Sequence, residues 1–101
     1  MITNALIATS GTDALTSPGN IAVVLVSLCN SLSSTVTVNM YVVPNGGTAS
    51  ITNKILSSRE LQGNDSLFLD TGKFLLSAGD KINITASSNN AVGATISYIT
   101  I

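Results

Sequence analysis

Residues 35–42 read TVTVNMYV, and this stretch decides the fold class. Every second residue from Val36 to Val42 is apolar, and the residues between them are Thr, Asn and Tyr. A period of two places the apolar residues on one side of an extended backbone, as in a strand with one buried face. The many β-branched residues favour the same conformation. The stretch therefore predicts a half-buried β-strand.

The same alternation returns at 81–86 (KINITA) and at 92–99 (VGATISYI), with Ile82, Ile84 and Ala86 expected to face inward. Residues typical of turns separate the apolar segments: SPGN at 17–20, PNGG at 44–47, QGND at 62–65, AGD at 78–80 and SSNN at 87–90. The Asn and Gly residues tolerate the positive φ that tight reversals need. Asp80 is expected to fix the turn before Lys81.

Short strands at about ten-residue spacing are typical of an antiparallel sandwich. We therefore predict an all-β chain with one domain over residues 1–101, an Ig-like or jelly-roll-like β-sandwich of seven or eight strands. The expected strands cover about 3–9, 20–30, 34–43, 50–57, 66–70, 73–77, 81–87 and 92–101. Residues 57–61 have fair helical propensity and could instead form a single helical turn.

Charge is scarce: Lys and Arg number 4, Asp and Glu number 5, and mean hydropathy is +0.47. Four scattered cations make no basic surface for nucleic acid or for anionic lipid. The first residues lack the regions of a secretory signal, and no apolar run reaches the ~20 residues of a membrane span. We expect a chain made in the cytoplasm, without nucleic-acid or membrane partners.

Catalytic chemistry is not indicated. The chain has no His and one Cys, so the usual zinc sites and His-based acid–base catalysis are not expected. The Asp residues fall in or beside predicted turns, where Asp most often caps the backbone. Calcium is the alternative, because oxygen ligands could come from Gly63, Asn64 and Asp65 with Asp70, or from Asp80 with loop carbonyls, although no spacing resembles an EF-hand. We expect no enzyme, cofactor, metal or small-molecule substrate.

Residues 21–28 (IAVVLVSL) depart from alternation because both sides of the strand are apolar. A sandwich covers one face of each sheet, so the second side needs another cover. Either a segment of the chain folds over it or a partner subunit does. The candidate interface residues are Ala22, Val24, Val26, Leu28, Tyr41, Tyr98, Ile99 and Ile101. Cys29, Phe68 and Phe74 lie in apolar runs and are expected in the core.

Two stretches resemble small virion structural proteins of tailed bacteriophages, cyanophage-like ones especially. They are TVNMYVVPNGGTASITNKIL, with YVVPNGG as its most distinctive part, and LFLDTGKFLLSAGDKINITASSNNAVGATISYITI. The resemblance covers residues 36–101 and carries no catalytic residues.

The resemblance implies a β-sandwich that serves as a building block of the particle, assembled in the bacterial cytoplasm. It favours a capsid decoration (cement) protein, bound to other virion proteins such as the major capsid protein and acting as a homo-oligomer. The alternatives are a tail, neck or fibre component, or a module that binds a host receptor or glycan.

Overall fold

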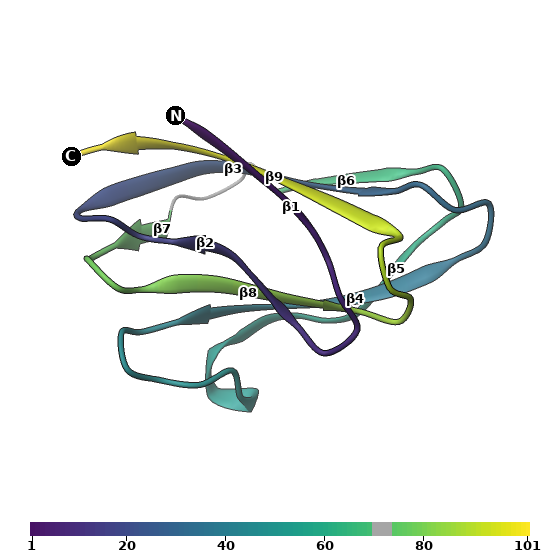
Figure 1. The fold of residues 1–101 in the computed structure, drawn as a ribbon, viewed down its shortest axis with the longest axis horizontal. Helices are drawn as coiled ribbons and strands as arrows, with labels where there is room; N and C mark the ends of the chain where they lie inside the picture. The colour runs from purple at the N-terminus through teal and green to yellow at the C-terminus, as the bar shows by residue number, and fades with distance from the viewer. Residues whose placement is uncertain (70–73) are drawn as a thin grey trace.

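The computed structural model describes residues 1–69 and 74–101, and nearly all of its regular structure is β-strand (Figure 1). Asp70 and the ends of two expected strands lie outside the described residues. The strands are β1 Ile2–Leu6, β2 Thr12–Thr16, β3 Ile21–Asn30, β4 Val36–Val43, β5 Lys54–Leu61, β6 Ser66–Leu69, β7 Phe74–Leu76, β8 Lys81–Ala86 and β9 Val92–Thr100. One 3-10 turn, η1, covers Ile51–Asn53.

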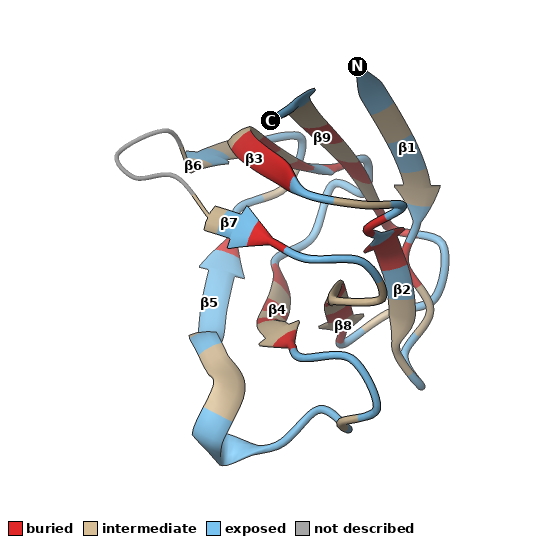
Figure 2. Cartoon of the chain, turned by 90° about the vertical axis from the view of Figure 1, so that its left-hand side faces the viewer, coloured by how far each residue is buried: buried red, intermediate tan, exposed pale blue. Residues whose placement is uncertain are grey.

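The strands form two antiparallel sheets that pack face to face (Figure 2). The first sheet has the order β1-β9-β3-β6, and β7 also pairs with β3. The second sheet has the order β2-β8-β4-β5. Strands β6 and β7 pair with successive parts of β3 and so occupy one edge. With that edge counted once, this order is the jelly-roll arrangement of two Greek keys. The predicted β-sandwich is confirmed, with jelly-roll connectivity.

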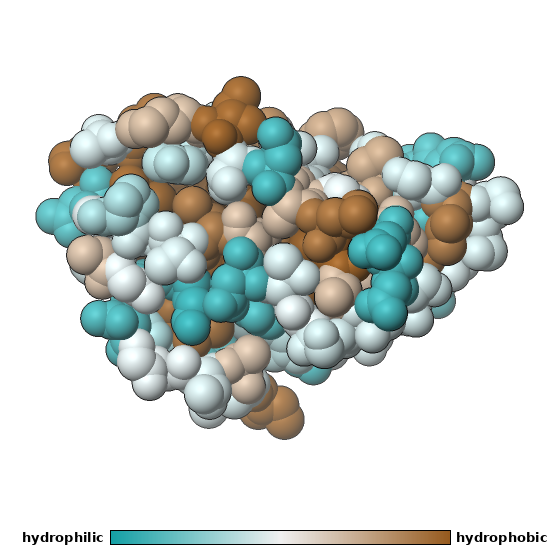
Figure 3. All heavy atoms as spheres, in the orientation of Figure 1, coloured by the Kyte–Doolittle hydropathy of each residue, from teal (hydrophilic) through white to brown (hydrophobic). Residues whose placement is uncertain are grey.

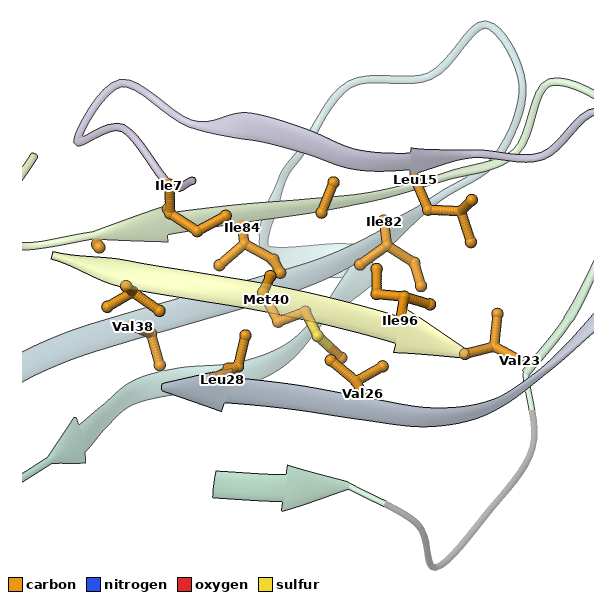
Figure 4. Packing of buried hydrophobic residues seen from close by; sticks show 14 of the residues in the cluster. Ile7, Leu15, Val23, Val26, Leu28, Val38, Met40, Ile82, Ile84 and Ile96 are labelled. Carbon is orange, nitrogen blue, oxygen red and sulfur yellow. The ribbon is translucent and has the colours of Figure 1, made fainter. Parts of the chain in front are cut away.

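One apolar core fills the space between the sheets (Figure 4). The alternation predicted for β8 is confirmed, because Ile82 and Ile84 are fully buried and Ala86 nearly so. Strands β4 and β9 also send alternate residues inward, among them Val38, Met40 and Ile96. Removing such side chains from water is the main favourable term in folding, at about 25 cal/mol per Å² of apolar surface.

Three local predictions were wrong. Strand β2 was not foreseen, because a bulge between Asp13 and Leu15 breaks its alternation and leaves Ala14 and Leu15 both buried. Strand β5 begins at Lys54 rather than residue 50, since η1 occupies the residues before it. Residues 57–61 are strand rather than helical turn. Ser58 has a φ of 48° there, and its N–H donates to Oδ1 of Asn39 at 2.8 Å.

Strand β3 contains a bulge that changes which of its residues face the core. Its register against β9 shifts between Val23 and Leu25, so two residues take the place of one. Val23 and Val26 therefore both lie in the core, although simple alternation places them on opposite sides. Val26 and Leu28 were expected on the second side of the strand, covered by a partner subunit or another segment. That placement was wrong, because both are fully buried in the core between the sheets.

Candidate protein interface

The outer face of the first sheet is built from four rows of residues that face each other across the strands. The rows follow from the register of β1, β9, β3, β6 and β7, whose outward positions alternate with core residues. The rows are Leu6-Gly93-Cys29-Ser66, Asn4-Thr95-Ser27-Phe68, Ile2-Ser97-Leu25, and Ile99-Ala22-Leu75. We call this surface the apolar face.

Five large apolar side chains stand out from the apolar face with exposed fractions between 51% and 71%: Ile2, Leu6, Phe68, Leu75 and Ile99. They come from four different strands, so they spread over the whole face. None of the charged residues that the structure describes belongs to the four rows. Figure 3 looks onto the β1–β2 edge of the sandwich and shows hydrophobic residues among hydrophilic ones on its upper part. Such a surface is costly to leave in water.

A shallow hollow lies in the apolar face where β9 passes between β1 and β3. It measures about 400 Å³ and is lined by Asn4, Ala5, Leu6, Cys29, Gly93, Ala94 and Thr95. Gly93 leaves this space open, since no atom lies within 4 Å of the position that a Cβ would take there. Cys29 is exposed at its rim, so the prediction of a buried Cys29 was wrong. The hollow is lined by both apolar and neutral polar residues.

The outer face of the second sheet has a different character, because its polar groups bind each other. Nδ2 of Asn83 donates to Oδ1 of Asp13 at 2.8 Å, and Nζ of Lys81 lies 3.7 Å from Oδ2 of the same carboxylate. Further along this face, Nζ of Lys54 sits 5.6 Å from the centre of the Tyr41 ring. These pairs remain hydrated at the surface, as expected for the wet side of an antiparallel sheet.

The structure separates the eight candidate interface residues. Ala22 and Ile99 lie on the apolar face, with Val24 half-buried in the β3 bulge. Tyr41 lies on the second sheet, and Tyr98 packs against the core. Ile101 is exposed beyond the end of β9, and Val26 and Leu28 are buried as described above. Contact of the exposed members with a partner stays a prediction.

Sequence reasoning missed four residues that contribute most to the apolar face: Ile2, Leu6, Phe68 and Leu75. Phe68 was expected in the core, but it is 60% exposed and only its neighbours Leu67 and Leu69 face inward. Alternation within the SLFL segment is the signal that could have found it. Phe74, by contrast, packs against the core as predicted.

No protein-family model matches the chain, and neither the curated proteins nor the solved structures yield a match. Among residues 1–69 and 74–101, no group of three or more His, Cys, Asp or Glu residues is placed to hold a metal ion. The described part of the chain also has no helix long and apolar enough to span a membrane.

Proposed function

We propose that this chain is a non-enzymatic structural protein of a tailed-phage particle. In this role it decorates the capsid, and the apolar face binds another virion protein, with the major capsid protein as the first candidate. The particle would assemble in the bacterial cytoplasm, where the thiol of Cys29 stays reduced.

The observation that supports the proposal is the apolar face itself. Burying it removes five large, exposed side chains from water. No charge in its four rows would lose its hydration, so a partner need not supply a matching charge. A protein that stabilises a shell needs a broad contact of this kind more than it needs a pocket.

Two further points agree with this role. The jelly roll is a fold of viral capsid domains, although lectins and other proteins also use it, so the fold alone does not assign a function. Residues 36–101 resemble virion proteins of tailed phages, and this segment supplies Phe68, Leu75 and Ile99 to the apolar face.

Mass spectrometry of purified particles tests the proposal. We expect the chain in the particle at tens to hundreds of copies, and in the capsid fraction when heads and tails are separated. Recovery in the tail fraction would contradict the capsid assignment. Absence from both fractions would refute the virion role.

Variants then test the surface. Leu75→Asp and Phe68→Asp place a carboxylate on the apolar face, where it would be desolvated on binding. We expect both to retain the wild-type melting temperature, because the side chains are mostly exposed, and to lose particle binding at least tenfold. Ser57→Asp, exposed in β5, is the matched control and should bind normally. Normal binding by both face variants would show that the apolar face is not the surface that binds the particle.

A further inference from the structure

Among residues 1–69 and 74–101, no strand pairs with the outer edge of β1, and no hydrogen bond reaches the backbone groups on that edge. Met1 and Tyr98 exchange backbone hydrogen bonds of 2.6 and 2.8 Å, and the N–H of Ile7 donates to the carbonyl of Val92 at 3.0 Å. Hydrogen-bonded residues alternate along an antiparallel pair, so residues 3 and 5 also bond to β9. The N–H and C=O groups of Ile2, Asn4 and Leu6 therefore point away from the sheet.

The other sheet edges carry features that oppose strand addition. β5 exposes Arg59 and Glu60 and is kinked at Ser58, where φ is positive. β6 and β7 are only 4 and 3 residues long. β2 has a bulge and the charged Asp13. Short length, charge and bulges are the usual protections of an edge.

β1 has none of these protections. It is 5 residues long, ITNAL, without charge, proline or bulge. An open edge of this kind is a template for another strand. In Figure 2, β1 forms the outermost strand on its side of the first sheet.

We propose that β1 pairs with β1 of a second copy of the chain, antiparallel and about a two-fold axis at Asn4. In this register Ile2 lies opposite Leu6 of the second copy, and Asn4 lies opposite its own equivalent. The three residues with free backbone groups then form three hydrogen-bonded pairs, with about six hydrogen bonds. At each end of the contact, Ile2 of one copy lies beside Leu6 of the other on the outer face. The side-chain amides of the two Asn4 residues lie next to each other at the axis.

The sequence of β1 selects this register over its neighbours. A register shifted by two residues still places free backbone groups opposite each other. It pairs Asn4 with Ile2 or Leu6, however, and leaves only two hydrogen-bonded residue pairs instead of three. A slip by one residue directs the side chains to the wrong faces. Self-complementarity about one residue is what a two-fold interface requires, which is why a second copy fits better than an unrelated strand.

Pairing also extends the apolar face, because Ile2 and Leu6 belong to it and lie next to the axis. The two first sheets become one continuous sheet with a doubled outer surface. Each chain has a net charge of −1, so repulsion between copies is weak. Pairing through β1 involves only two copies of this chain and needs no other virion protein.

The first test measures mass in solution with the purified chain, without any extension before Met1. Strand-edge contacts are small, so sedimentation equilibrium should cover about 10 to 500 μM. We expect the mass to rise from 10.3 kDa toward twice that value. Asn4→Pro removes the central N–H and should stay monomeric, whereas Asn4→Ala keeps this N–H and should dimerise. A monomeric wild type throughout the range, or a dimeric Asn4→Pro, would overturn the proposal.

The second test fixes the register and does not rely on proline. In a Cys29→Ser background, Asn4→Cys places two thiols in a hydrogen-bonded pair with Cα atoms about 5.5 Å apart, within the range of a disulfide. We expect rapid cross-linking under mild oxidation. Ile2→Cys is the matched control and should not cross-link, because its equivalents lie four residues apart in this register. Equal cross-linking of both variants would refute the register. Absence of cross-linking in Asn4→Cys would refute the pairing, whatever Ile2→Cys does.

Discussion

The carboxylate of Asp80 is joined to the backbone of Asn45, 35 residues earlier in the chain. Oδ1 of Asp80 accepts a hydrogen bond from the N–H of Asn45 at 2.8 Å, and Oδ2 accepts one from the N–H of Ser77 at 2.9 Å. The Asp80 side chain therefore stabilises the turn before β8 and also hydrogen-bonds to the loop that follows β4. The prediction that Asp80 fixes this turn is confirmed, and the link to Asn45 was not foreseen.

Asp80→Ala should lower the free energy of unfolding by about 1–2 kcal/mol, since two backbone donors lose a charged acceptor but remain partly open to water. Asp80→Asn keeps one acceptor oxygen, so its free energy of unfolding should fall by less than that of Asp80→Ala. Urea denaturation followed by circular dichroism measures both. An unchanged midpoint for Asp80→Ala would mean that water replaces the carboxylate at no cost.

Asn30 is fully buried and holds the loop of residues 31–35 against the end of β5. Its Nδ2 donates to the carbonyls of Ser34, Leu61 and Gln62 at 2.8, 3.0 and 3.2 Å, and its Oδ1 accepts from the N–H of Leu32 at 3.0 Å. Asn30→Ala should destabilise the fold by about 2–4 kcal/mol, because buried groups lose their partners. Thermal unfolding measures this loss.

Asn30→Asp separates hydrogen bonding from size. The side chain keeps its shape but turns a carboxylate oxygen toward three carbonyl oxygens, so we expect at least as large a loss as for Asn30→Ala. Asn20→Ala is the matched control at an exposed asparagine and should change stability by less than about 0.5 kcal/mol. A tolerated Asn30→Asp would show that the amide donor is dispensable.

Two glycines should respond in opposite ways to the same added methyl group. A Cβ on Gly63 would overlap the backbone carbonyl of Ser33, whereas a Cβ on Gly93 would meet no atom within 4 Å. Gly63→Ala should lower the free energy of unfolding by more than about 2 kcal/mol, because the backbone at Ser33 must move to make room. Gly93→Ala should be neutral or stabilise the fold by about 0.5–1 kcal/mol, because alanine loses less conformational entropy than glycine when it enters a strand. Melting temperatures of the two variants compare them directly, and equal effects would contradict the close packing at Gly63.

The sequence predicted the elements whose alternation is regular. Strands β4, β8 and β9 follow the period of two, so their inward residues could be read directly, and turns at Gly46 and Asn90 have the positive φ expected of them. Asn and Gly adopt that conformation more easily than other residues. Bulges account for most of what failed, because one extra residue in β3 reverses the side assigned to Val26 and Leu28.

The apolar face was predicted only in outline. An excess of apolar residues in β3 and at the C-terminal strand indicated a second covered side, but its members depend on which strands become neighbours. Leu75 and Ile99 flank Ala22 only because β7 and β9 both pair with β3. Such pairing joins residues far apart in the chain, and periodicity within one segment contains no information on it.

Cys29 provides a direct measure of whether the apolar face is covered. It is the single cysteine, it is exposed at the rim of the hollow, and it lies beside Gly93 in one row of the face. In the free chain its thiol should react with a maleimide as fast as an exposed model thiol. In purified particles we expect labelling to slow at least tenfold, because a bound partner would exclude the reagent. Ser57→Cys in a Cys29→Ser background is the control on β5 and should label equally in both states. Equal reactivity of Cys29 in chain and particle would mean that the hollow stays open, and the partner would then have to bind elsewhere.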